Sequence, residues 1–99
     1  MVALTSKQKQ YLKGLAHPLS PIVRIGKGGV SQGVIAETRN ALDVHELIKV
    51  RIDMEDSSDR KATAEGLAHA ADAELVGTLG KIAMLYRERA EEPEIKLPS

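Results

Sequence analysis

The spacing of apolar residues along the chain predicts three helices and four strands. In the first segment, apolar residues recur with helical spacing after Thr5, which forms a capping box with Gln8 three residues later. This helix ends at His17-Pro18, because the residue before a proline is disfavoured in the helical conformation. The apolar run 22–25 then predicts the first strand.

A second helix and a second strand follow a glycine-rich loop. Ser31 is a good N-cap, and the apolar residues of the segment 34–42 fall on one helical face. Residues 46–52 predict a strand, because apolar and basic side chains alternate along it, although Leu47 is out of step. A strand, a helix and a strand joined by short links imply a right-handed crossover and parallel pairing.

The remaining chain predicts a third helix over roughly residues 60–72 and then a hairpin. The two strands of the hairpin are 73–76 and 81–87, joined by a turn region that contains Gly77 and Gly80. The last strand is therefore expected to run antiparallel to the one before it.

Together these elements predict an α/β fold, a two-layer αβαβαββ domain with a four-stranded mixed sheet. We place this single domain at residues 1–87. The acidic segment 88–99 is expected to form a flexible tail, in which Ile95 and Leu97 are the side chains able to dock.

Composition excludes several classes of protein. The chain of 99 residues is long enough for about one domain with a modest core. It contains no cysteine, which excludes disulfides and thiolate metal sites. Because its start lacks the apolar core of a signal peptide and no apolar stretch approaches membrane-spanning length, we expect a cytoplasmic protein with no membrane partner.

The net charge is zero, but the charges are unevenly distributed. Residues 1–52 hold eight basic and three acidic groups, a net charge of +5, and residues 53–99 hold six basic and eleven acidic groups, a net charge of −5. A polyanion is therefore expected to meet the first half of the chain, while the acidic half discourages indiscriminate binding. The alternative is a chance asymmetry on a solvated surface.

The basic half contains the loop Gly26-Lys27-Gly28-Gly29, which lies between a predicted strand and a predicted helix. Free backbone N–H groups and the dipole of the helix that begins after Ser31 favour an anion near this loop. Lys27 adds a mobile positive charge. The arrangement predicts a phosphate grip, although a Gly-x-x-Gly pattern alone is also typical of a tight turn that needs positive φ.

Other chemistries fit the sequence less well. The glycine loop matches the first two glycines of a dinucleotide fingerprint, and Asp53 stands near the position of the ribose-binding acid, but Ser31 replaces the third glycine. The acidic loop around Asp56 lacks the glycine and glutamate of a calcium loop. No nucleophile has a local base partner. We therefore expect neither catalysis nor a metal, a cofactor or a small-molecule substrate.

Nucleic-acid binding fits best, through the backbone of the nucleic acid. Tyr11 and Tyr86 are the only aromatic residues, so a base-stacking platform is not expected. A Gly-x-x-Gly loop lets the main chain approach phosphates closely, as in a class of RNA-binding module that clamps about four nucleotides.

Five separated motifs give the chain a resemblance to the YhbY family, the bacterial form of the CRM domain (chloroplast RNA splicing and ribosome maturation). The motifs are Leu4-Thr5-Ser6-Lys7-Gln8, Leu15-Ala16-His17-Pro18-Leu19, Ile25-Gly26-Lys27-Gly28-Gly29, Glu46-Leu47-Ile48-Lys49-Val50, and Gly80-Lys81 with Leu85-Tyr86-Arg87. The resemblance covers nearly the whole chain. It implies an RNA-binding protein associated with precursors of the large ribosomal subunit, with a fold similar to the C-terminal domain of translation initiation factor three.

The resemblance also implies that the family's Gly-Lys-x-Gly loop, which is held to contact RNA, corresponds to Gly26, Lys27, Gly28 and Gly29. Many members have Asn where this chain has Gly28. From charge alone we add six further candidate RNA contacts: Lys7, Lys13, Arg24, Lys49, Arg51 and Arg87.

The sequence thus predicts a non-enzymatic, monomeric RNA-binding factor in assembly of the large ribosomal subunit. Two alternatives from other classes stay open at this point. One is a nucleotide-binding, Rossmann-like protein, and the other is a protein-interaction module that uses the acidic half.

Overall fold

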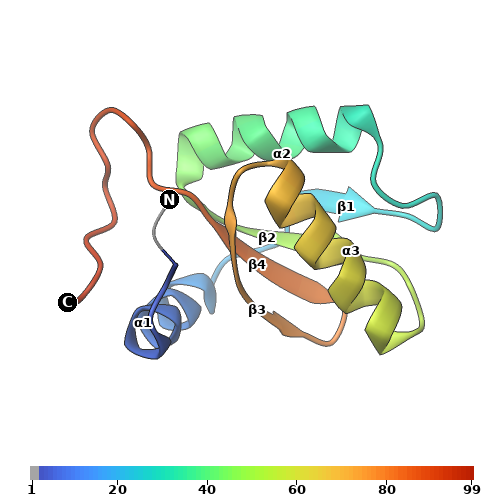
Figure 1. The fold of residues 1–99 in the computed structure, drawn as a ribbon, viewed down its shortest axis with the longest axis horizontal. Coiled ribbons are helices and arrows are strands. Elements are labelled where there is room, and N and C mark those ends of the chain that lie inside the picture. The colour runs from blue at the N-terminus through green and yellow to red at the C-terminus, as the bar shows by residue number, and fades with distance from the viewer. Residues whose placement is uncertain (1–2) are drawn as a thin grey trace.

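The computed structural model describes residues 3–99, which form three helices and four strands in the predicted order (Figure 1). The elements are α1 (Ser6–Ala16), β1 (Val23–Ile25), α2 (Gln32–His45), β2 (Leu47–Ile52), α3 (Ser57–Ala70), β3 (Glu74–Leu79) and β4 (Ile82–Tyr86). The sheet has the order β1-β2-β4-β3. β1 pairs with β2 in parallel, and β4 pairs antiparallel with both β2 and β3. The predicted αβαβαββ domain with a mixed sheet is confirmed.

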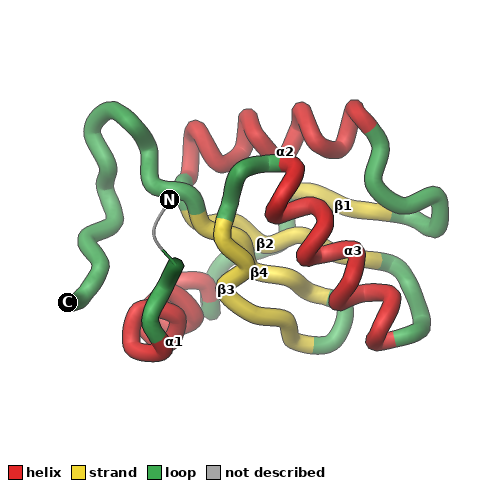
Figure 2. Tube along the Cα trace, in the orientation of Figure 1, coloured by secondary structure: helices red, strands yellow, loops and turns green. Residues whose placement is uncertain are grey.

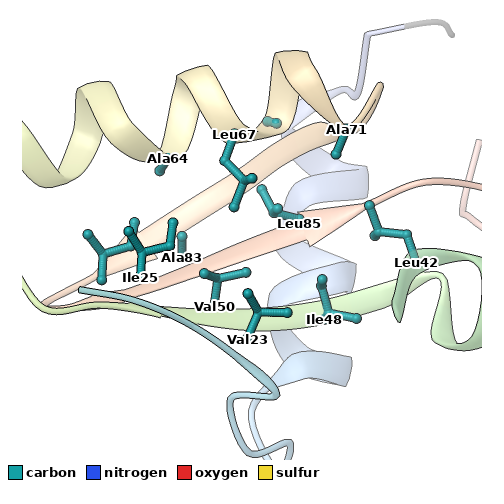
Figure 3. Close-up of a cluster of buried hydrophobic side chains, with 12 residues drawn as sticks. Val23, Ile25, Leu42, Ile48, Val50, Ala64, Leu67, Ala71, Ala83 and Leu85 are labelled. Atoms are coloured by element: carbon teal, nitrogen blue, oxygen red, sulfur yellow. The ribbon is translucent and has the colours of Figure 1, made fainter. Parts of the chain in front are cut away.

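The helices lie on both faces of the sheet (Figure 2). α2 and α3 cover one face and enclose the larger core (Figure 3), which consists of Val23, Ile25, Leu42, Ile48, Val50, Ile52, Ala64, Leu67, Ala68, Ala71, Ala83 and Leu85. α1 covers part of the opposite face over a smaller core of Leu12, Ala16, Leu47, Val76, Met84 and Tyr86. α1 does not cover the part of that face next to β1, where the side chain of Arg24 is 72% exposed.

The helix starts follow local capping chemistry. The Thr5 Oγ1 accepts a hydrogen bond from the Gln8 N–H, and the Gln8 side chain accepts one from the Thr5 N–H, which confirms the capping box. Asp56 caps α3 by accepting from the amides of Ser58 and Asp59. This cap explains why α3 begins at Ser57, earlier than the expected start near residue 60. No helix within residues 3–99 is long and apolar enough to cross a membrane.

The hairpin differs from the prediction at one glycine. Gly77 lies within β3, next to an irregularity in the pairing of β3 with β4 between Leu75 and Gly77. The turn is confined to Gly80, which has φ 58°, and its neighbour. Gly77 was wrongly placed in the turn, because glycine is as typical of a bulge or a close approach within a strand as of a turn. The close approach is real here, since a Cβ on Gly77 would lie 2.7 Å from the Lys13 Cε.

A buried carboxylate at the end of α2 holds the C-terminal segment against the domain. Glu46 is 1% exposed and has a positive φ of 63°. Its side chain accepts hydrogen bonds from the backbone amides of Arg89, Glu94 and Ile95 at 2.8–3.0 Å. Ile95 and Leu97 pack against the smaller core. The segment thus contacts the domain, while its flexibility stays a prediction.

These contacts set the charge state of Glu46. Burial acts to raise the pKa of Glu46, but the hydrogen bonds from the backbone amides of Arg89, Ile95 and Glu94 outweigh it, and the net shift is downward. A lowered pKa in the folded state means that the ionised carboxylate stabilises the fold. This stability is present above the pKa of Glu46 in the unfolded chain and is lost as the pH falls through the folded value.

We therefore expect the amide proton signals of Arg89, Glu94 and Ile95 to titrate together as the pH falls, with a midpoint below about 4.3, the value of an unperturbed glutamate. The measurement is an NMR pH titration of the backbone amides. In Glu46→Gln, which removes the titrating group, this shared transition should be absent. A midpoint at or above the ordinary value in the wild type would contradict the assignment.

Candidate functional site

The glycine loop forms a tight turn between β1 and α2, at the right of Figure 1. The Gly29 N–H donates to the Gly26 carbonyl at 3.1 Å, so Lys27 and Gly28 occupy the two central positions. Gly29 has φ 78°, a conformation that favours glycine, whereas the φ of Gly28 is not positive. Lys27 and Gly28 are both exposed. The turn therefore presents a lysine and a bare backbone to the outside.

The start of α2 adds hydrogen-bond donors beside this turn. The Ser31 Oγ accepts from the Val34 N–H at 3.2 Å, as expected of an N-cap. Within the described part of the chain, the preceding amides of Gln32 and Gly33 donate to no protein acceptor. Free amides at a helix start, together with the helix dipole, favour an anion. The turn, its lysine and this helix start have the chemistry of a phosphate site.

Two arginines lie side by side on the open sheet face behind the turn. Arg24 of β1 and Arg51 of β2 are direct register partners in the parallel pair. Their side chains are 72% and 44% exposed, and the Nε atom of each donates to a different oxygen of Asp53. The hydrogen bonds from Arg24 and then from Arg51 lower the pKa of Asp53. Asp53 is thus ionised at neutral pH and bridges two basic side chains.

Lys49, on the same strand as Arg51, is engaged in the protein itself. Its Nζ donates to the carbonyl oxygens of His17 and Leu19 at 3.1 and 3.0 Å. These bonds tie the segment after α1 to the sheet. Lys49 therefore stabilises the arrangement of α1 on the sheet and is less free than Arg24 to reach a ligand.

The candidate lysines of α1 lie on the same side of the sheet. Lys7 and Lys13 are both exposed. The stem of Lys13 passes over Gly77 of β3, as the close approach to that glycine indicates. The structure thus places the arginine pair and the lysines of α1 on one face of the sheet. Lys27 lies at the end of β1, two residues beyond Ile25, and lines a hollow with residues of α3.

Arg87 lies apart from these residues. Its guanidinium donates to the carbonyl oxygens of Ala71 at 2.8 Å and Arg39 at 3.2 Å, and it pairs with Asp43. The side chain is only 16% exposed. Arg87 therefore joins the end of β4 to α2 and α3, on the side that α1 does not cover.

The basic and acidic halves of the sequence meet in space beside the turn. A hollow of about 440 Å³ is lined by Lys27 and by the acidic side chains of Asp53, Glu55 and Asp59. The basic first half and the acidic second half of the sequence therefore do not form separate basic and acidic surfaces here. Among residues 3–99, no group of three or more His, Asp or Glu side chains is placed to hold a metal ion.

Sequence reasoning missed the role of Asp53, which it considered as a ribose-binding acid and, with the acidic loop that follows, as a metal ligand. The structure pairs this carboxylate with Arg24 and Arg51 instead. A signal was present, because parallel pairing of the two predicted strands places both arginines on one face and Asp53 follows directly at the strand end.

Comparison with known proteins relates this chain to a family and to several relatives. Residues 4–87 match the family model described as the CRS1 / YhbY (CRM) domain. A Haemophilus influenzae protein named RNA-binding protein is 45% identical over 99% of this chain and 98% of its own length. The probable RNA-binding protein YqeI of Bacillus subtilis is 41% identical over 96% of this chain and 99% of its own.

A solved structure has the same fold. It is the solution structure of a hypothetical Staphylococcus aureus protein described as a candidate RNA-binding protein, and it superimposes with a TM-score of 0.86. The two sequences are 44% identical, and the alignment covers 96% of this chain and 99% of the other.

The turn geometry predicts opposite effects of alanine at two neighbouring glycines. Gly29→Ala should lower the free energy of unfolding by about 1–2 kcal/mol, because alanine is strained at the positive φ of Gly29. Gly28→Ala should be neutral or stabilising, since its φ is not positive and nothing lies within 4 Å of an added Cβ. Urea denaturation of both variants measures the difference, and equal destabilisation would contradict the turn geometry.

Proposed function

Because the chain belongs to the CRS1 / YhbY (CRM) domain family over residues 4–87, we propose that it is a non-enzymatic, monomeric RNA-binding protein of the cytoplasm. In this proposal it associates with precursors of the large ribosomal subunit through ribosomal RNA and assists their assembly. The names of its relatives, which are called RNA-binding proteins, support the binding of RNA.

The observation that carries the proposal is the exposed turn Gly26–Gly29 at the start of α2. Lys27 supplies a positive charge, and the absence of side chains at Gly26, Gly28 and Gly29 allows an RNA backbone to approach the main chain. The free amides that begin α2 supply donors for a phosphate oxygen. Such contacts read the backbone and not the bases, so they fix the position of the RNA without specifying its sequence.

The rest of the proposed RNA surface is the open sheet face and α1. Arg24 and Arg51 lie on the two strands that end near the turn, and Lys7 and Lys13 continue the basic surface. Lys49 contributes its charge to this surface, although its Nζ already donates to two carbonyl groups. Arg87 is not included, because carbonyl groups and Asp43 occupy its donors.

A double variant of the turn tests the proposal. Lys27→Asp with Gly28→Asp places two negative charges where we expect a phosphate, so the affinity for labelled ribosomal RNA should fall at least tenfold. Wild-type binding should also weaken steeply between about 50 and 200 mM salt, because each phosphate contact releases counterions. Fluorescence titrations at the two salt concentrations measure both effects.

The chain offers a matched control for this variant on α3. Lys61→Asp with Gly66→Asp makes the same change of charge at exposed positions, and nothing lies within 4 Å of a Cβ added to Gly66. The control should bind more tightly than the turn variant. If both variants bind like the wild type, the turn is only structural; a wild type that binds no RNA, free or in precursor particles, would refute the proposed function.

Arg87 and Lys27 should behave in opposite ways. Arg87→Gln removes charge-assisted hydrogen bonds to the carbonyl groups of Ala71 and Arg39, so we expect a loss of about 1–3 kcal/mol in the free energy of unfolding and an unchanged RNA affinity of the folded protein. Lys27→Gln should leave stability unchanged and weaken RNA binding. Urea denaturation and RNA titration of the two variants provide the comparison. A large loss of RNA affinity in stable Arg87→Gln would place Arg87 in the interface.

A further inference from the structure

Asp53 joins two arginines that would otherwise repel each other. Arg24 and Arg51 are register partners on adjacent parallel strands, which lie about 4.8 Å apart. Two exposed guanidinium groups at this spacing repel, and each long side chain has many rotamers. The Asp53 carboxylate accepts a hydrogen bond from the Nε–H of each arginine, on a different oxygen for each. In this structure it joins both side chains in one arrangement.

The geometry of these bonds leaves the other donors of both arginines free. A guanidinium has five N–H donors, and only the Nε–H of Arg24 and of Arg51 is used on Asp53. The terminal nitrogens of the two side chains make no hydrogen bond to any acceptor within residues 3–99. Terminal nitrogens of this kind are the donors that bind phosphate oxygens in a two-pronged manner.

Asp53 is itself held in place by the backbone. It directly follows β2, and its N–H donates to the Ile25 carbonyl of β1 at 2.9 Å. The neighbouring acid Glu55 differs, because its side chain is 91% exposed and pairs only with Lys81. Asp53 and Glu55 are thus two neighbouring carboxylates, of which only Asp53 bonds to the two arginines.

We infer that Asp53 is a positioning residue that holds Arg24 and Arg51 as a paired-guanidinium site for the phosphodiester backbone of RNA. This inference rests on the proposed function and deepens it. Arg24 lies two residues before Gly26, so an RNA strand that contacts the turn continues onto the paired arginines. The turn and the arginine pair then bind neighbouring stretches of one RNA backbone.

Substitution of Asp53 distinguishes a role in positioning the two arginines from the effect of its negative charge on RNA binding. Asp53→Asn removes a negative charge, so electrostatics alone would tighten RNA binding and steepen its salt dependence. Positioning has the opposite consequence. Because the arginines lose their common anchor, the affinity should fall by about three- to tenfold, with a shallower salt dependence.

The experiment titrates labelled ribosomal RNA at two salt concentrations with wild type, Asp53→Asn and Glu55→Gln. Glu55→Gln is the matched control, since it removes the same charge nearby and should bind as well as the wild type or better. In an Arg24→Gln, Arg51→Gln background, Asp53→Asn should cause no loss, because there is nothing left to position. Urea denaturation checks that each variant is folded.

A second measurement needs no RNA. In NMR spectra of the free wild-type protein, the Nε–H groups of Arg24 and Arg51 should be protected from exchange with solvent. This protection should be lost in Asp53→Asn. Tighter RNA binding by Asp53→Asn would overturn the inference, and so would exchange protection of the Nε–H groups that persists in Asp53→Asn. Either result would leave the proposed function intact. A wild type that binds no RNA would instead remove the proposed function, and this inference with it.

Discussion

The alternation of side chains along β2 determines both faces of this protein. β2 lies between β1 and β4, and Ile48, Val50 and Ile52 are buried on the face under α2 and α3. Lys49 and Arg51 consequently point to the opposite face. A shift of one residue in register would place both basic side chains in the core. The same hydrophobic requirement that builds the core therefore also fixes where the charged groups stand.

The junction before β2 combines strain with a buried charge. A positive φ at a non-glycine residue such as Glu46 costs of the order of 1–3 kcal/mol. Hydrogen bonds to a charged group contribute about 1.5–3 kcal/mol each, and Glu46 accepts them from three backbone amides. These bonds can offset the strain. The C-terminal segment thus completes the smaller core through Ile95 and Leu97, although its composition is that of a disordered tail.

Features of the fold that depend on nearby residues could be predicted from the sequence. The capping box at Thr5 and the N-cap at Ser31 are local, and both were identified correctly. Gly77 was misplaced because a bulge depends on the pairing between strands, which a single segment does not encode. The role of Arg87 depends on Asp43, and the bridging role of Asp53 depends on Arg24, which are both far away in the sequence. Charge alone therefore could not distinguish a bridging or structural group from a free one.

The outer strand β3 limits how far the sheet extends. An edge strand offers unpaired backbone groups on which a second molecule can add a strand, and this is a common route to aggregation. Here the irregularity between Leu75 and Gly77 distorts that edge, and the charged side chains of Lys9 and Lys61 line the groove beside it. A strand added at this edge would have to desolvate these lysines and pair with a strand whose hydrogen-bond register is irregular. The β3 edge of the sheet is thereby protected against growth from one molecule into the next.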